Sequence, residues 1–505
     1  WNLYYIYMLS ISVSNFTHLL IHTLIQDIIN THQTLEQQVG TKKSSNTRMS
    51  TLSSLLGGQM EVETFFEKIF QRDVLVVKSN KVTRSLYERL NFGSERIFEW
   101  IRRSELTYEK DLTVTRVNKD GIRENFHESE SGAARFDKVV TKQFKEKGCS
   151  LRLLCPQAHS PSIHRVLSEL ELEFEDFVSS NAYLTPGNTQ GFAAHYDDIE
   201  AFVLQLEGKK TWTIFRPESE ADMLPRYSSP DFLIEDLNMK PYKTVTLEPG
   251  DMLYFPRGFV HFARTPTDSK HSLHLTVSTG QTNSYVDLME IIQAEALRNA
   301  IETSVAMRRG VARGLTSKLA GVRNESKSDS RDRASFLRHV HGMCDYVRDV
   351  SHDLVDAAVD QLARKRLRGR LPIEFPTRWK TDLVLSSSHT EVRLVRRDVL
   401  HLAIEQSEDG ETSAVVYHCA RNSCRYMEYP ESRLEFSLCF APLVESLLDC
   451  GDGEYIKIEN LVDNLIDVLN DFEDPLVRMG RSVIRSNLRG AFISVLLENG
   501  VVECR

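Results

Sequence analysis

The chain has 505 residues, a length that at ordinary domain sizes predicts about three domains. Its 41% hydrophobic and 26% charged residues are typical of folded soluble proteins and exclude an intrinsically disordered chain. The formal net charge of −9 excludes a uniformly basic nucleic-acid-binding surface, so any basic site must be local.

The beginning of the chain is apolar with interspersed polar residues, and its first residue is Trp1. The first lysine is Lys42, so the basic segment that opens a signal peptide is missing there. The length would suit a membrane span, but polar residues interrupt it, and no membrane association is expected. An irregular chain start, fragmentary or wrongly joined, is the preferred interpretation, with Met49 or Met60 nearer the functional beginning. Residues 1–59 are expected to be a poorly structured segment or linker.

Residues 60–284 are predicted to form the largest domain. The expected elements are a helix at 61–71, a strand at 73–79, a helix at 83–104 and several short strands within 151–279. Short strands without intervening helices favour a barrel or a sandwich. Hairpin turns are expected at Glu207-Gly208 and between Glu248 and Asp251.

The rest of the chain divides into two further predicted domains. Residues 285–375 have apolar positions at helical spacing on both sides of a polar break at 324–333. These positions are expected to serve a core or a dimer interface, so a homodimer is predicted through this region. Residues 376–505 alternate predicted strands, such as 414–419, with predicted helices, such as 441–450.

Eight cysteines in so long a chain are too few for a disulfide scaffold, and no two of them form a CxxC pair. This usage favours reduced thiols in an intracellular compartment. It also argues against structural zinc on cysteine pairs.

The strand-rich region contains a candidate metal-binding triad. His195 and Asp197 are two residues apart, so on a strand both side chains would leave the same face. His261 ends a G-x5-P-x-G-x2-H pattern that begins at Gly250. Each histidine alone is more often structural, but together the three residues form the two-His, one-carboxylate triad of non-haem Fe(II) sites. Such a triad leaves coordination positions open for a bidentate co-substrate and O2.

Lys210 provides independent support for a co-substrate. It shares one face of a predicted strand with Trp212 and Ile214, which suggests that this face points inward. A buried ammonium costs several kcal/mol unless an anion meets it, and the distal carboxylate of a 2-oxoacid would do so. The alternative is that Lys210 lies at the start of its strand and extends to water.

The last strand of this region has a polar face formed by Ser272, His274, Thr276 and Ser278. The other face is apolar. The polar face fits either solvent or a polar barrel interior, and the local pattern does not choose between them.

The segments RLLCPQ, NAYLTPGNTQGFAAHYDDIEAFVLQLEGKK, GDMLYFPRGFVHFA and HSLHLTVST closely resemble the Jumonji-C ribosomal oxygenases. The nearer branch is the nucleolar one, described as bifunctional histone lysine demethylases and ribosomal histidyl hydroxylases. The resemblance is specific over residues 150–280 and looser elsewhere. It implies an α+β protein with three parts: a jelly-roll, cupin-like double-stranded β-helix, a helical dimerisation domain and a C-terminal winged-helix-like domain.

The resemblance also implies roles for individual residues. It assigns His195, Asp197 and His261 to Fe(II), Lys210 and the hydroxyl of Ser278 or Thr276 to 2-oxoglutarate, and Asn181 and Tyr183 to the substrate. Gly187 and Ala194 depart from the family, because they stand where prolines are usual. One extra residue after His261 leaves the Ser278 assignment less secure than the metal ligands.

The activity that the resemblance implies consumes 2-oxoglutarate and O2 at Fe(II). The substrates would be a histidine of a large-subunit ribosomal protein and methyl-lysines at positions four and thirty-six of histone H3. Which C–H bond reaches the iron decides between hydroxylation and demethylation. Kinship also implies residence in the nucleus, in the nucleolus and nucleoplasm.

Two alternatives remain open on the sequence. The first is a cupin-type non-oxidative metalloenzyme such as an isomerase, although an inward Lys210 argues against it. The second is a chromatin or ribosome interaction protein with an inactive barrel. The basic run from Arg364 to Arg370 could serve nucleic acid or nuclear import, or could be a solvated helix end. The acidic composition of the tail predicts no strong direct nucleic-acid binding.

Overall fold

A computed structural model of the chain divides it into Trp1–Met49 and Ser50–Arg505. The structure describes residues 49–126, 132–311, 313, 331–351, 354–376, 383–407, 410–451, 453–471 and 475–505. The irregular chain start and residues 324–330 of the polar break lie outside this range. Among the described residues, no helix is both long and apolar enough to cross a membrane. All eight cysteines are free, as the sequence predicts.

Short helices precede the main sheet. They and the first strand are α2 (Thr51–Leu55), α3 (Val62–Lys68), β1 (Leu75–Val77), α4 (Lys81–Leu90) and α5 (Ser94–Arg102). The expectation that residues 1–59 form a poorly structured segment is wrong at its C-terminal end, because α2 buries Leu52 and Leu55 completely in the domain core. The single helix expected at 83–104 is also wrong. Asn91 adopts a left-handed conformation (φ 44°) and ends α4 before α5 begins.

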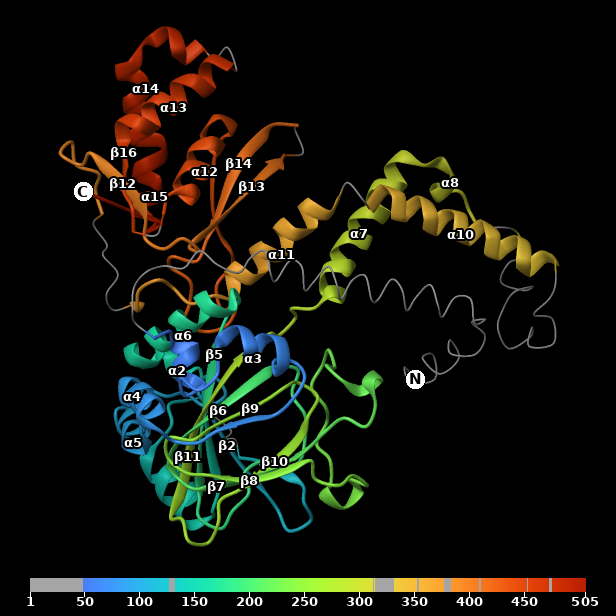
Figure 1. The fold of residues 1–505 in the computed structure, drawn as a ribbon, viewed down its shortest axis with the longest axis vertical. Coiled ribbons are helices and arrows are strands. Elements are labelled where there is room, and N and C mark those ends of the chain that lie inside the picture. Colours follow the sequence, from blue (N-terminus) through green and yellow to red (C-terminus); the bar gives the residue numbers. More distant parts are fainter. Residues whose placement is uncertain are drawn as a thin grey trace. The chain divides into compact units, whose positions relative to one another are not determined.

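Two antiparallel sheets build the predicted domain of residues 60–284 (Figure 1). Its further elements are β2 (Leu112–Val117), β3 (Arg123–Asn125), β4 (Ser150–Leu154), α6 (Pro161–Phe174), β5 (Ser179–Pro186), β6 (Glu200–Gly208), β7 (Lys210–Phe215), β8 (Lys243–Leu247), β9 (Met252–Phe255), β10 (Val260–Arg264) and β11 (His271–Thr279). The large sheet has the order β1-β9-β6-β11-β5-β4-β2-β3, and the small one the order β10-β7-β8. β6, β9 and β11 lie in the large sheet and β7, β8 and β10 in the small one, so the chain crosses between the sheets after β6, β8, β9 and β10 and forms the predicted double-stranded β-helix.

The two expected hairpins are wrong. β6 pairs with β9 and β11, whereas β7 pairs with β8 and β10, so the Glu207-Gly208 turn carries the chain from one sheet to the other. The turn between Glu248 and Asp251 does the same from β8 to β9. Turn residues signal a reversal of the chain, but they do not determine which strands pair.

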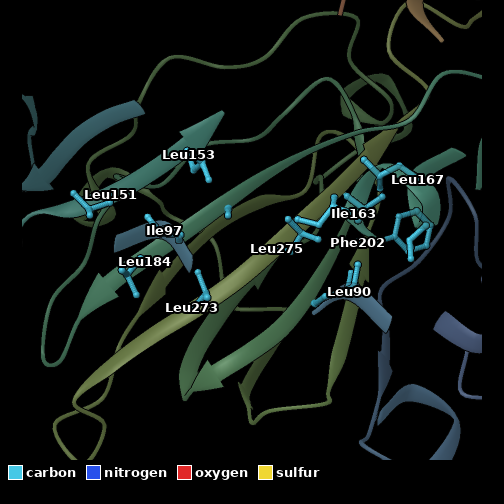
Figure 2. Close-up of a cluster of buried hydrophobic side chains, with 14 of the residues drawn as sticks. Leu90, Ile97, Leu151, Leu153, Ile163, Leu167, Leu184, Phe202, Leu273 and Leu275 are labelled. Carbon is cyan, nitrogen blue, oxygen red and sulfur yellow. The ribbon is translucent and has the colours of Figure 1, made fainter. Parts of the chain in front are cut away.

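The side chains of the large sheet alternate between two environments. Phe202 and Leu204 of β6 face the helix side and join the main core. Figure 2 shows this core, with Leu184 and Leu273 on strands of the sheet and Ile97 from α5. Ala201 and Val203 of β6 instead pack with residues of the small sheet. The space between the sheets holds the site described below.

The remaining elements follow this domain. They are α7 (Tyr285–Thr303), α8 (Val305–Arg308), α10 (Arg331–Ser351), α11 (Val355–Gly369), β12 (Glu391–Leu394), β13 (Leu400–Gln406), β14 (Thr412–His418), β15 (Ser432–Ser437), α12 (Ala441–Asp449), β16 (Ile456–Lys457), α13 (Ile458–Asp471), α14 (Arg481–Asn487), α15 (Ser494–Glu498) and β17 (Val502–Cys504). Strands β13, β14 and β15 form an antiparallel meander, and β12 pairs with β16 and β17. The winged-helix character of this region stays a prediction.

The basic run at the end of α11 is engaged within the chain. Its contacts are Arg364 with Glu405 (2.8 Å) and Glu431 (2.9 Å), Arg366 with the Asn283 side chain, Arg368 with the Tyr429 carbonyl (3.0 Å) and Arg370 with Asp398. These contacts occupy the guanidinium groups that a nucleic-acid site or an import signal would have to present. The arginines of the run therefore tie α11 to neighbouring segments, whereas Lys365 and Arg368 keep exposed surface.

Candidate metal centre

Two imidazoles and one carboxylate converge between the sheets. Ligand atoms of His195, Asp197 and His261 all lie within 4.8 Å of one another. The Asp197 carboxylate is 3.7 Å from His195 Nε2 and 3.6 Å from His261 Nε2. A divalent ion bound at about 2.1 Å from each donor fits such a set. The triad predicted from the sequence is therefore assembled in the structure.

The backbone fixes which nitrogen each histidine can offer. His195 Nδ1 lies 2.8 Å from the Ala193 carbonyl, and His261 Nδ1 lies 3.0 Å from the Phe259 carbonyl. A carbonyl only accepts, so both Nδ1 atoms donate, and each Nε2 keeps a lone pair directed at the triad. Burial, and then the neighbouring His195, lowers the pKa of His261 to about 4. The ring is therefore neutral at physiological pH, as a metal ligand must be.

The strand expected for His195 and Asp197 is wrong. His195 forms an isolated antiparallel bridge with His261, through backbone bonds of 3.2 and 2.8 Å, and Asp197 follows outside any strand. β6 begins only at Glu200. The backbone amide of Gly258 donates to the Asp197 carbonyl at 3.1 Å. Pairing with the segment around His261, rather than strand alternation, thus brings the carboxylate to the two imidazoles.

Lys210 points inward at the start of β7. Its side chain is 4% exposed, and its ammonium donates to the Thr185 hydroxyl at 2.9 Å. Among the described residues, no carboxylate lies within ion-pair distance of it. Burial lowers the pKa of Lys210 to about 7. The prediction of an inward lysine is confirmed, and the alternative of a side chain extended to water is excluded.

The triad and Lys210 line one cavity of about 460 Å³. All four remaining candidates line the same cavity: Asn181 and Tyr183 from β5, and Thr276 and Ser278 from β11. The polar face of β11 thus faces the interior, which settles the question that the sequence leaves open. Ser278 donates to the Ser179 carbonyl at 3.4 Å. The structure does not choose between Thr276 and Ser278, so their roles stay predictions.

Arg152 and His274 are among the cavity residues that were not predicted as site residues. Arg152 of β4 lies over the ring of Tyr183, 5.8 Å from its centroid. His274 of β11 is buried and stacks on Tyr183 with ring centroids 4.8 Å apart. Burial lowers the pKa of His274 well below its ordinary value, so the ring is neutral. Strand alternation on the polar face of β11 could have identified His274. Arg152 lies in the segment RLLCPQ, which resembles the family but has no local pattern that marks Arg152 as a site residue.

Comparisons with known proteins agree with this geometry. Residues 152–288 match the JmjC domain family. Ribosomal oxygenase 1 of Rattus norvegicus is 39% identical over 438 residues, which cover 83% of this chain and 70% of the rat protein. The bifunctional lysine-specific demethylase and histidyl-hydroxylase NO66 of Culex quinquefasciatus is 33% identical over 82% of this chain. The solved ribosomal oxygenase YcfD of Escherichia coli aligns with a TM-score of 0.41 and 14% identity, over 88% of this chain and 98% of its own.

The chain spans less than two thirds of some of these relatives. It covers 64% of the Culex quinquefasciatus protein and 61% of its counterpart in Aedes aegypti, to which it is 35% identical over 77% of this chain. The substrates and partners of the longer proteins therefore come to this chain only as proposals.

Proposed function

Since the chain belongs to the JmjC family of ribosomal oxygenases, we propose that it is an Fe(II)- and 2-oxoglutarate-dependent protein oxygenase. The observation that carries the proposal is a metal-binding triad and a buried ammonium that line one cavity. The triad suits Fe(II), and Lys210 suits the distal carboxylate of 2-oxoglutarate, which would offset the cost of burying its charge. The alternative of a non-oxidative cupin gives this ammonium no partner.

The residues of the chain prepare the site for oxidation. When bound, Fe(II) with 2-oxoglutarate and O2 supplies the oxidation of a substrate C–H bond. His195 and His261 present Nε2 in a fixed tautomer, so the metal position is set before it is filled. Trp212 and Phe255 pack beside the His261 ring, with centroids 5.9 and 4.5 Å away, and exclude water from that side.

Relatives carry names that state histidyl hydroxylation and lysine demethylation. We propose a histidine of a large-subunit ribosomal protein as the first substrate and methyl-lysines of histone H3 as the second. Asn181 and Tyr183 would hold the substrate, and Ser278 or Thr276 would assist 2-oxoglutarate. These substrates imply residence in the nucleus, with nucleolar and nucleoplasmic pools.

The proposal predicts succinate release that depends on Fe(II), 2-oxoglutarate and O2 together. We expect a ribosomal-protein peptide to gain the mass of one oxygen atom and a methylated H3 peptide to lose one methylene, both read by mass spectrometry. Protein purified and loaded anaerobically is the appropriate material, because air oxidises Fe(II). A correctly folded, metal-loaded protein that never consumes 2-oxoglutarate would instead favour the isomerase or the inactive barrel.

We further propose a homodimer through the helical region. Five apolar side chains of α7 are between 43 and 57% exposed: Tyr285, Val286, Met289, Leu297 and Ile301. Tyr285 and Met289 are one turn apart, and so are Leu297 and Ile301, so each pair is adjacent on the helix surface. Exposed apolar side chains of this kind are typical of an interaction surface.

Replacing Leu297 and Ile301 by glutamate together is expected to halve the mass measured by light scattering at micromolar concentration. Two charges in an apolar interface cost more than a dimer of ordinary size tolerates. Ile122→Glu, at a residue 56% exposed in the loop between β2 and β3, is the matched control and should leave the mass unchanged. A wild-type protein that is already monomeric would remove the dimer proposal.

A further inference from the structure

One wall of the cavity comes from the C-terminal region. The segment Asn422–Tyr429 between β14 and β15, here called the tail loop, places Tyr426 among the residues that line the cavity. The Tyr426 ring packs on Phe177, which also lines the cavity, with centroids 4.6 Å apart and an interplanar angle of 34°. Tyr426 thus brings an aromatic surface to the same cavity as the metal triad.

The tail loop is fixed to the catalytic domain by buried polar contacts. Arg425 donates to the buried carboxylate of Asp111 at 2.5 Å, and His159 lies 3.1 Å from the same oxygen. These two partners hold the pKa of Asp111 well below its ordinary value, against the effect of its burial. Gln157 donates to the Cys424 carbonyl at 3.2 Å. The position of Tyr426 is therefore set by the β-helix, not by a free loop.

The amide of Asn422 secures the other end of the loop. It donates to the carbonyls of Leu367, Arg368 and Arg370 at 2.8, 3.2 and 3.0 Å. The guanidinium of Arg368 donates to the carbonyls of Tyr429 and Met427 at 3.0 and 3.5 Å. Its charge is thus held on the loop backbone.

A carboxylate shares the cavity with this ring. Asp198 accepts from the Ser228 hydroxyl at 2.7 Å and from the Gln281 amide at 3.0 Å, and all three residues line the cavity. Both donors are neutral, and no described cation lies within ion-pair distance of Asp198. Arg123, a cation of the same cavity, is 3.1 Å from Asp231. Asp198 therefore brings a negative charge that the chain itself does not neutralise.

We propose that Tyr426 and Asp198 form a subsite for a basic side chain of the protein substrate, close to the residue that is oxidised. An aromatic face and a carboxylate are the two groups that bind a guanidinium or an ammonium. The inference deepens the proposed function, on which it rests, by naming a feature of the substrate. It also gives the C-terminal region a part in substrate selection.

An arginine scan tests the subsite. The probe is a labelled glycine–serine peptide with one histidine, in which a single arginine is stepped through the positions on either side. Binding is read by fluorescence anisotropy with Mn(II) and 2-oxoglutarate without oxygen, so that no turnover is needed. In the wild type we expect one or two arginine positions to lower Kd about tenfold. Tyr426→Ala and Asp198→Asn should each remove most of that gain, and Tyr426→Phe should keep it.

Tyr429→Ala is the matched control, because Tyr429 lies in the same loop, is 49% exposed and does not line the cavity. It should keep the arginine preference. Metal content measured on Asp198→Asn verifies that the neighbouring ligand Asp197 is intact. A flat scan in the wild type, or a preference that survives Tyr426→Ala, overturns the subsite. A further outcome separates the subsite from the proposed function. If the arginine preference is found, but none of these peptides and neither the ribosomal nor the histone peptide supports succinate release with Fe(II) and O2, the proposed function is overturned and the subsite stands.

Discussion

Replacing His261 by alanine is expected to abolish both metal binding and 2-oxoglutarate turnover. The ring supplies one of three protein ligands, and its Nε2 faces the Asp197 carboxylate at 3.6 Å. Two ligands cannot hold Fe(II) against water, so we expect the metal affinity to fall by about a hundredfold or more. Succinate release should fall to background with it. Metal content after gel filtration and succinate release are the two measurements.

A second histidine of the same domain provides the control. His271, at the start of β11, lies 2.7 Å from Glu207 and does not line the cavity. His271→Ala therefore loses a contact with one carboxylate outside the cavity and should retain the metal. Equal metal content in the His261 variant and the wild type would show that the triad is not the metal site.

The sequence predicted the chemistry of the site better than the path of the chain around it. Lys210 could be recognised because it lies on a real strand, where alternation determines the face, whereas His261 was recognised from the glycine and proline pattern that precedes it. Asp197 was also identified, but the expectation that it shares a strand face with His195 was wrong. Its position depends on the pairing of His195 with His261. Pairing between distant segments is tertiary information that local periodicity does not contain.

The same limit explains the two wrong hairpins and the overlooked Tyr426. Gly208 has a positive φ of 60° and marks a genuine turn, but the turn joins two sheets. Tyr426 follows a strand far from the triad in sequence, and tertiary contacts such as those of Arg425 and Asn422 bring it to the cavity. Residues of this kind carry no local pattern, so a structure is needed to find them.

Lys210→Met is expected to produce two effects of opposite sign. Loss of the ammonium should raise the KM for 2-oxoglutarate about a hundredfold, because a charge-paired contact to a carboxylate in a closed cavity is removed. The ligand-free protein should at the same time become more stable. Among the residues that the structure describes, the buried ammonium of the wild type meets only the Thr185 hydroxyl, and methionine fills a similar volume without a charge.

The pH dependence gives the stability effect its signature. The pKa of Lys210 is about 7 in the folded protein, against an ordinary value of 10.5, so between these values the unfolded chain binds more protons. The free energy of unfolding of the wild type therefore rises with pH across this window. The stability advantage of Lys210→Met should be on the order of a few kcal/mol at pH 7 and below, and should shrink as pH approaches 10. Denaturant unfolding at several pH values measures it.

Lys209→Met separates this effect from a general loss of lysine. Lys209 is adjacent in sequence but solvent-exposed, and its ammonium lies 3.3 Å from both Glu248 and Asp268. Its replacement should leave the KM for 2-oxoglutarate unchanged and should not stabilise the protein. If Lys210→Met lowered stability as Lys209→Met does, the ammonium at 210 would be satisfied within the chain. Lys210 would then no longer support an anionic co-substrate, because its positive charge would already be neutralised by the chain itself.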